Sequence, residues 1–275
     1  MRKKELIELL NKNFPLKSLG QNFLIKESIL RKISSFAEIK EDDFILEIGA
    51  GFGNLTKELA KKAKKVLAIE KDKRMINLAK EFLKDFKNVE ILNEDVLKID
   101  LSKLNLQKGY KVVGNLPYHI SKPVIQKFLK IKERPSLMIF LVQKEVAQRI
   151  CAKAPKTNFL ALFVQFYANA KILDYVKKDY FWPRPKVDGA ILKIEPLKNG
   201  YQKIINPEIF FKVLKAGFSH PRKQIINNLT SLLKQDKIKI IEILQKNKIP
   251  KTKRPENLNL KTWIKLAKDL ASFLK

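Results

Sequence analysis

The stretch Phe44–Asn54, FILEIGAGFGN, decides the fold class. Its first half is a short apolar run, which is typical of a strand buried in a sheet. Its second half is rich in glycine, and apolar residues then recur at helical spacing over residues 55–63. A strand that ends in a glycine turn and leads into a helix is the first unit of an open α/β sheet, whose turns approach bound ligands closely.

The same alternation continues along the chain. Further strands are predicted over residues 66–69, 89–92, 111–113 and 137–142, with a helix over 75–86. The last strand, LMIFLV, is uninterrupted by polar residues, as expected for a strand buried on both faces. Strands separated by helices predict a parallel sheet with helices on both sides.

The pattern changes after residue 197. Pro196, Asn199-Gly200 and Pro207 interrupt it, and the rest of the chain is predicted to be entirely helical, over residues 208–218, 222–234, 238–247 and 260–274. We therefore expect two domains, an α/β domain over residues 1–198 and a small helical domain over residues 199–275.

Charge is the strongest feature of the composition. The 275 residues carry a net charge of +29, with 57 basic and 28 acidic residues. Residues 1–100 contain 21 basic and 17 acidic residues, so the remaining 175 contain 36 and 11, and net charges are +4 and +25. Because clustered cations gain by releasing counterions from phosphates, this asymmetry favours a nucleic acid partner, with an anionic membrane surface or no specific partner as alternatives.

Several classes of protein are excluded or disfavoured. No window of 18 uncharged apolar residues is present, so no transmembrane helix is expected. The basic amino-terminal residues lack the apolar core of a secretory signal, and the predicted compartment is the cytoplasm. Cys151 is the single cysteine and there are two histidines, which excludes a disulfide framework and a cysteine-based zinc site and disfavours a histidine-rich metal site.

The glycine turn indicates the kind of ligand. Gly49, Gly51 and Gly53 have the spacing G-x-G-x-G, and Asn54 stands where a dinucleotide-binding turn has its last glycine. This departure disfavours NAD and favours a nucleoside ligand without a phosphate. A glycine turn alone is also compatible with a tight connection of no function.

Two carboxylates strengthen the ligand hypothesis. Glu70 ends the second strand, where it can accept hydrogen bonds from both ribose hydroxyls. Asp95 follows the third strand, where it can accept from an adenine amino group. Each alone could be a helix cap, but together with the glycines they lie at successive carboxyl ends of strands, where open α/β sheets bind ligands. The combination predicts S-adenosylmethionine.

A second motif, Asn115-Leu116-Pro117-Tyr118, follows the fourth strand. The lone pair of an adenine amino group is delocalised into the ring, which makes it a poor nucleophile. The Asn115 side-chain oxygen and the Leu116 carbonyl can accept its two hydrogens and favour a more tetrahedral nitrogen. Tyr118 can stack on a base turned out of its helix, and Pro117 stiffens the turn. The same residues could also form a turn of no function, and His119 is not expected to act as a base.

With these motifs in place, the chain resembles the family of small-subunit (16S) ribosomal RNA adenine N6-dimethyltransferases. The resemblance runs almost end to end through LGQNFL at 19–24, the glycine turn, Glu70, Asp95, NLPYHIS at 115–121, QKEVA at 143–147, FWPRPKVDGA at 181–190, Phe218 with Arg222-Lys223, and RPENL at 254–258. Departures are Gly189 for a usual serine, His220-Pro221 before Arg222, and Thr157-Asn158-Phe159.

The resemblance implies a Rossmann-like class I methyltransferase sheet with a small carboxy-terminal helical domain that binds RNA. It implies a monomer without a membrane partner that dimethylates N6 of two adjacent adenosines in the 3′-terminal hairpin of small-subunit rRNA, on the RNA or the assembling subunit. By position, the cofactor contacts would come from Asn22, Leu24, Gly49, Gly51, Glu70, Asp95 and Asn115. Phe181 would stack on the target base opposite Tyr118.

Three alternatives stay open. An erythromycin-resistance type methylase would modify one adenine of large-subunit rRNA with a similar motif, but residues 254–258 and Leu116 favour the dimethyltransferase. DNA adenine and glutamine methyltransferases usually carry Pro-Pro-Tyr in place of Leu-Pro-Tyr. A non-catalytic ribosome-assembly or transcription factor on the same fold is disfavoured by the intact Asn115 and glycine turn.

Overall fold

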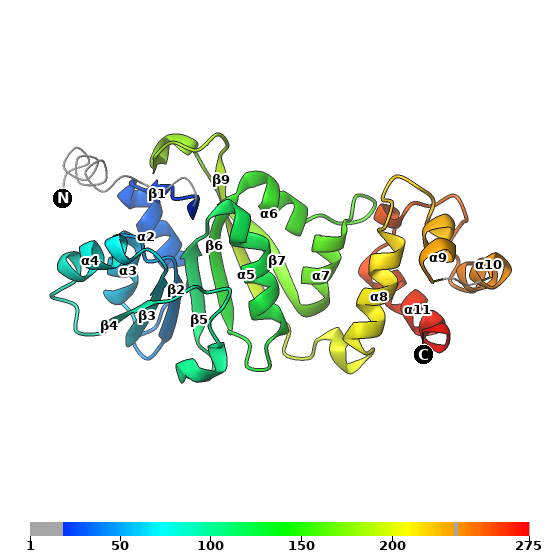
Figure 1. Cartoon of the computed structure of the whole chain (residues 1–275), viewed down its shortest axis with the longest axis horizontal. Coiled ribbons are helices and arrows are strands. Elements are labelled where there is room, and N and C mark those ends of the chain that lie inside the picture. The colour runs from blue at the N-terminus through cyan, green and yellow to red at the C-terminus, as the bar shows by residue number, and fades with distance from the viewer. Residues whose placement is uncertain (1–18, 234–235, 275) are drawn as a thin grey trace. The chain divides into compact units, whose positions relative to one another are not determined.

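The structure is a computed structural model that describes residues 19–233 and 236–274. The chain divides into two compact units (Figure 1). The α/β unit contains the described residues up to Ala147 and Lys171–Pro196, and the helical unit contains Gln148–Ala170 and the residues from Leu197 onward. The chain passes from the α/β unit to the helical unit for the last time after Pro196, near the boundary predicted at residue 198. Residues 148–170, which we expected in the first domain, group with the helices.

The α/β unit is built on a sheet of order β4-β3-β2-β5-β6-β9-β7. Its strands are β2 (Phe44–Ile48), β3 (Lys65–Glu70), β4 (Val89–Asn93), β5 (Lys111–Asn115), β6 (Leu137–Gln143), β7 (Ala168–Val176) and β9 (Gly189–Pro196). All neighbouring strands from β4 through β3, β2 and β5 to β6 pair in parallel, as predicted, and β9 runs antiparallel to β6. A second, two-stranded sheet pairs β1 (Phe23–Leu24) with β8 (Phe181–Trp182).

All five predicted strands form within a residue or two of their expected bounds, because each is an apolar run. Strands β7 and β9 are not apparent from the sequence pattern. In β9 the apolar run is broken by Lys193, which is nevertheless buried. Its Nζ atom lies 2.8 Å from Glu38 Oε1 and 3.1 Å from Glu195 Oε1, so paired carboxylates let a lysine occupy a sheet position that would otherwise read as a loop.

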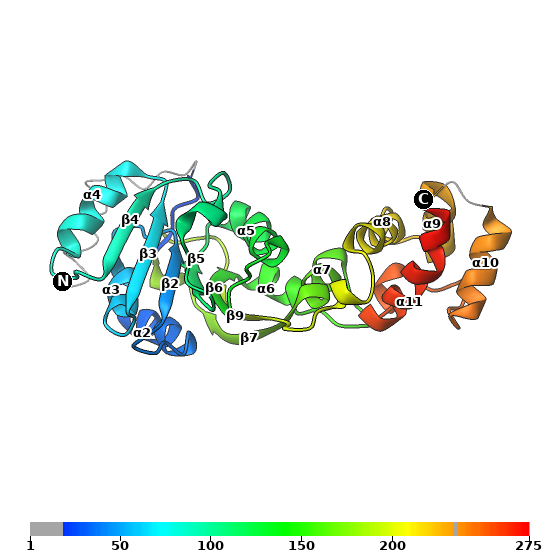
Figure 2. The ribbon, with the colours of Figure 1, turned by 90° about the horizontal axis from the view of Figure 1, so that it is seen from below.

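Helices cover both faces of this sheet, α2 and α3 on one and α5 on the other (Figure 2). Helix α4 packs beside α3, where Lys57 Nζ lies 5.0 Å from the centre of the Phe82 ring. The α-helices among the described residues are α2 (Glu27–Phe36), α3 (Asn54–Ala60), α4 (Lys73–Phe82), α5 (Tyr118–Lys130), α6 (Lys144–Ile150), α7 (Phe159–Tyr167), α8 (Pro207–Gly217), α9 (Ile225–Leu233), α10 (Lys237–Lys246) and α11 (Leu260–Leu270). Ile33 of α2 and Leu59 of α3 pack on Ile45 and Ile139 of the strands in one fully buried core cluster. None of the described helices is long and apolar enough to cross a membrane.

The helical unit explains why residues 148–170 leave the first domain. Helix α7 is apolar except for Gln165 and contributes Phe166, whose ring stacks on Phe210 of α8 with centroids 4.5 Å apart. Just before α7, the Thr157 hydroxyl donates to the backbone oxygens of Glu256 and Leu258 at 2.9 and 3.1 Å. Segments about a hundred residues apart therefore form one core. The predicted helix end at Lys234 and the basic amino-terminal residues lie outside the described residues.

Candidate active site

A pocket of about 360 Å³ opens at the carboxyl ends of β2, β3, β4 and β5. Such a volume is typical of small-molecule sites. The side chains and turns that line it include every site residue predicted from the sequence, namely Asn22, Leu24, Gly49, Gly51, Glu70, Asp95, Asn115, Leu116, Tyr118 and Phe181. All of them belong to the α/β unit.

The glycine turn forms the floor of the pocket. Gly49, Gly51 and Gly53 have φ values of 81°, 54° and 95°, a region that disfavours residues with a Cβ atom. A Cβ on Gly51 would lie 3.1 Å from the Phe23 ring. Asn54, which departs from the dinucleotide pattern, directs its Nδ2 atom to the Leu24 backbone oxygen at 3.4 Å. The turn therefore supports the 19–25 segment that lies against it.

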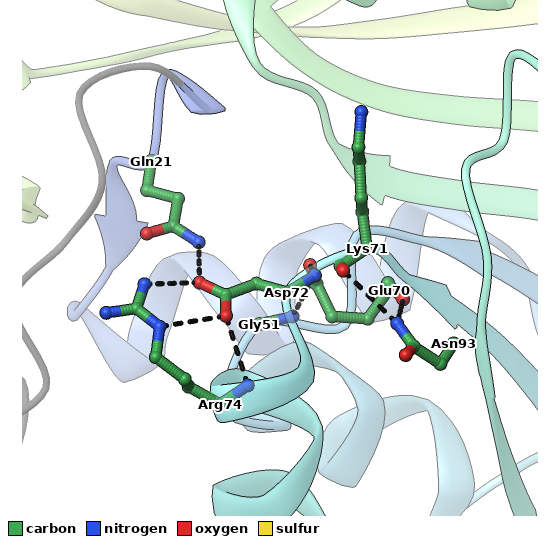
Figure 3. A network of polar contacts seen from close by, with 7 residues as sticks. All are labelled: Gln21, Gly51, Glu70, Lys71, Asp72, Arg74 and Asn93. Atoms are coloured by element: carbon green, nitrogen blue, oxygen red, sulfur yellow. Dashed lines mark hydrogen bonds and ion pairs between the residues drawn. The ribbon is translucent and has the colours of Figure 1, made fainter.

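Glu70 is nearly buried at the end of β3 (Figure 3). Its Oε2 atom accepts from the Gly51 backbone N–H at 2.9 Å, and its Oε1 atom accepts from the Asp72 N–H at 2.8 Å. Burial raises the pKa of this carboxyl, and the backbone hydrogen bonds partly oppose the rise. Since a carboxylate oxygen has two lone pairs, each oxygen can still accept a ribose hydroxyl.

Asp72 joins the 19–25 segment to α4. Its carboxylate caps the helix by accepting from the Arg74 N–H at 3.0 Å, and it accepts from Gln21 Nε2 at 2.9 Å. The Arg74 guanidinium also binds it, with Nη2 2.6 Å from Oδ2 (Figure 3). Burial opposes ionisation of Asp72, but these hydrogen bonds outweigh it and lower the pKa. Gln21 is thereby held beside the pocket.

Glu47 lies in β2, two residues before Gly49, and is fully buried. Among the described residues its carboxyl oxygens have no hydrogen-bond partner. Burial raises the pKa of Glu47 to about 8, and the Glu70 carboxylate adds to the rise. The Thr56 hydroxyl opposes the rise, although its oxygen also has no partner in good geometry within the described chain.

We predict that Glu47→Gln stabilises the protein at high pH. Since the folded-state pKa lies near 8 and the ordinary value is 4.5, unfolding releases a proton between these values, and stability falls as pH rises across this window. Glutamine cannot ionise, so the variant should be more stable by up to about 4 kcal/mol at pH 8 and similar to wild type below pH 4.5. Urea denaturation at several pH values measures this. A difference that does not grow with pH would contradict it.

The turn after β4 forms another wall of the pocket. Asp95 Oδ1 accepts from the Leu97 N–H at 2.9 Å, and its Oδ2 pairs with Lys71 Nζ at 2.9 Å. Burial opposes ionisation of Asp95, but these contacts prevail and lower the pKa. Asp95 is therefore an ionised acceptor beside the pocket, and Leu97 exposes an apolar side chain next to it.

Asn115 ends β5 with its amide fixed. Its Nδ2 atom donates to the Asn22 backbone oxygen at 3.0 Å, which leaves Oδ1 as the acceptor for a ligand. The Leu116 N–H donates to the Leu141 oxygen at 3.0 Å, which fixes the following turn. Close approach of β5 to β2 needs Gly114, where a Cβ would lie 2.7 Å from the Ile48 oxygen.

Two rings line the pocket beside this turn. Tyr118 begins α5, and its hydroxyl is buried without a hydrogen-bond partner among the described residues. Burial raises the pKa of Tyr118, and Asp188 adds to the rise. Phe181 of β8 pairs with Leu24 and is almost fully buried. His119 packs against Gly20, where a Cβ would lie 3.1 Å from its Nδ1 atom.

Sequence reasoning missed the residues that hold the 19–25 segment and the turn walls. These residues act through contacts between distant parts of the chain, and they are Gln21, Asn54 and Asp72. The neighbouring sequence could have predicted only that Asp72 caps a helix. In the described part of the chain, no group of three or more histidine, cysteine or acidic side chains is placed to hold a metal ion.

Comparison with known proteins agrees with this arrangement. The family model described as ribosomal RNA adenine dimethylase matches residues 12–268. The ribosomal RNA small subunit methyltransferase A of Dehalococcoides mccartyi (strain CBDB1) is 38% identical over 256 residues, which cover 93% of this chain and 88% of the relative.

Two solved structures confirm the predicted fold class, a Rossmann-like methyltransferase sheet with a carboxy-terminal helical part. A dimethyladenosine transferase from Plasmodium falciparum is 28% identical, with a TM-score of 0.77, and the match covers 91% of this chain and 98% of that one. The 23S rRNA methyltransferase ErmE shares the fold at 22% identity and a TM-score of 0.72, over 90% and 99% of the two chains. From the family match and the identity to its curated relative, the chain belongs to the ribosomal RNA adenine dimethylase family.

Proposed function

We propose that this protein is an S-adenosylmethionine-dependent dimethyltransferase that modifies N6 of two adjacent adenosines in the 3′-terminal hairpin of small-subunit rRNA, and that it acts in maturation of the subunit. Membership of the family supports the reaction and the cofactor. The observation that carries the proposal is one pocket lined by the carboxylates of Glu70 and Asp95 together with the Asn115 amide.

The residues present fit the cofactor. Glu70 offers two acceptors for the ribose, Asp95 offers one for the adenine amino group, and the positive φ of Gly51 lets backbone approach a ligand. When bound, the cofactor supplies a methyl group that is already activated on a sulfonium. The chain is left with orientation as its task, a contribution worth several kcal/mol when the reacting atoms are well aligned.

The target adenine would be held by the second motif. Asn115 Oδ1 and the Leu116 carbonyl accept the two hydrogens of N6, and Tyr118 and Phe181 offer ring faces for the base. The Asn22 oxygen supports this role for Asn115, because it holds the Nδ2 end of the amide and so orients the other end. After the first transfer N6 has a single hydrogen, so the second transfer needs one acceptor and room for a methyl group.

Mass spectrometry of rRNA tests the function. Assembling small subunits, and separately naked small- and large-subunit rRNA, are incubated with the protein and S-adenosylmethionine. We expect two adjacent dimethyladenosines near the 3′ end of the small-subunit RNA. Modification of one adenine in the large-subunit RNA would instead support the erythromycin-resistance type reaction, and cofactor binding without any transfer would support a non-catalytic factor.

The carboxy-terminal part is proposed to bind RNA phosphates. Residues 201–275 contain 17 basic and 5 acidic residues, a net charge of +12. We predict that RNA affinity falls steeply with salt, with a log–log slope of roughly 0.7–0.9 for each phosphate neutralised. Filter binding between about 50 and 200 mM salt measures the slope, with cofactor affinity in the same buffers as the control. A flat response of RNA affinity would contradict the role assigned to the charge.

The cytoplasmic location and the monomeric state expected from the sequence stay predictions. Analytical ultracentrifugation of the protein, alone and with the RNA hairpin, measures the second. A dimer at micromolar concentration would contradict it.

A further inference from the structure

The turn that carries Asp95 is held by few backbone hydrogen bonds within itself. It follows β4 and is closed by the Lys98 and Ile99 N–H groups, which both donate to the Asp95 backbone oxygen at 2.9 Å. Asp95, Val96 and Leu97 from this turn line the pocket. The carbonyls of Val96 and Ile99 take no part in these bonds and need donors from elsewhere, since an unpaired polar group in a partly buried place is costly.

Lys127 supplies those donors. Its Nζ atom lies 2.8 Å from the Val96 oxygen and 2.5 Å from the Ile99 oxygen. The side chain is partly buried, and burial lowers the pKa of its ammonium group while Asp95 and Asp100 oppose that effect. A long side chain that gives up hydration and rotamer freedom to bind two carbonyls of one turn acts as a tether for that turn.

Lys127 belongs to α5, the helix whose first residue, Tyr118, is proposed to stack on the target base. Helix α5 begins at Tyr118, directly after the Asn115–Pro117 turn, and Lys127 lies nine residues further, about 13.5 Å along the axis at 1.5 Å per residue. The first turn of α5 thus lines one wall of the pocket while its third turn holds the wall formed by Asp95 and Leu97. One helix therefore contacts both walls.

We propose that Lys127 is a positioning residue for adenine recognition, which holds the Asp95–Ile99 turn so that the Asp95 carboxylate faces the amino group of the cofactor's adenine. The proposal rests on the proposed function, because it assumes an adenine-containing cofactor in this pocket. Lys127 does not line the pocket, so its effect on a ligand passes through the turn.

The test compares two ligands that differ at the purine edge Asp95 would bind. S-adenosylhomocysteine has an amino group at C6 and an acceptor at N1, whereas its inosine counterpart has an oxygen at C6 and a hydrogen on N1. Calorimetry with the full-length protein gives the ratio of the two affinities. We expect wild type to prefer adenine by about a hundredfold, since a site built around an acceptor rejects a ligand without the matching donor. Lys127→Met should lower affinity for S-adenosylhomocysteine about tenfold and leave the inosine compound within twofold, so that the ratio collapses.

Lys122→Met is the matched control, because Lys122 is an exposed lysine of the same helix. It should keep the wild-type ratio. Turnover at saturating cofactor should stay within about threefold of wild type in Lys127→Met while the KM for cofactor rises, because the tether affects binding and not the reacting atoms. A structural defect alone would lower both affinities and turnover together.

Other outcomes overturn the inference in distinct ways. An unchanged ratio in Lys127→Met, or an equal loss for both ligands, would exclude a role in adenine positioning. If thermal unfolding shows that Lys127→Met does not fold, Lys127→Gln replaces it, since its amide can still donate to one carbonyl. Its ratio should fall about threefold, and an unchanged ratio would again overturn the proposal. Failure of wild type to bind S-adenosylhomocysteine at all would instead overturn the proposed function.

Discussion

Asn115→Ala is expected to lower methyl transfer by about a hundredfold or more at saturating RNA and cofactor, because N6 of the target adenine loses the acceptor that orients it. The structure fixes which end of the amide would act, since Nδ2 is bound to the Asn22 oxygen at 3.0 Å. RNA affinity should change little, because phosphate contacts carry most of it. Single-turnover transfer of labelled methyl groups to the RNA hairpin measures the rate, and filter binding measures the affinity.

His119→Ala is the matched control for this prediction. His119 is four residues away and also lines the pocket, and its ring packs on Gly20. We expect it to keep turnover within a few fold, since N6 becomes acidic enough on methylation to lose its proton to water. Normal transfer by Asn115→Ala, or abolished transfer by His119→Ala, would show that these roles are assigned wrongly.

Glu70→Ala is expected to weaken S-adenosylmethionine binding by about 1.5–3 kcal/mol, because two ribose hydroxyls lose their charged acceptor. The change also leaves the N–H groups of Gly51 and Asp72 without the carboxylate they bind now, so the floor of the pocket loosens. Calorimetry measures the affinity. Glu90→Ala removes the same charge from an exposed ion pair with Lys65 and should have no effect.

The pH dependence of binding gives a second measurement for Glu70. Burial raises the pKa of this carboxyl, so it is protonated at a higher pH than an ordinary glutamate as the solution is acidified. Wild-type affinity should therefore fall as pH drops toward that raised pKa, and the affinity of Glu70→Ala should not follow it. Equal affinity of wild type and Glu70→Ala at neutral pH would exclude the ribose role.

The sequence predicts the parts of this molecule that depend on local patterns. The strands from Phe44 to Gln143 are apolar runs between turns, and parallel strands bring their carboxyl ends to one edge, which is why the sequence alone could group Glu70, Asp95 and Asn115. Strand β9 could not be predicted in this way, because Lys193 interrupts its apolar run and the partner that allows this lysine to be buried, Glu38, is 155 residues away. Gln21 and Lys127 were missed for the same reason, since each acts on a distant segment that no spacing rule identifies.

Helix α7 shows a different limit. Its sequence, FLALFVQFY, is apolar except for Gln165, so its own pattern does not say which neighbour it packs on. The contacts of Phe166 with Phe210 decide this, and they assign residues 148–170 to the helical unit.

The interleaved segments of the two units have a consequence for synthesis of the chain. The α/β unit has all of its residues once Pro196 has been made, but by then α7 has already been made as well and its partners α8 and α11 have not. A nascent chain of about 200 residues therefore carries a finished sheet and an uncovered apolar helix. The helical unit closes only when Glu256 and Leu258 reach the hydroxyl of Thr157, so its folding waits until the residues up to Leu258 have been made.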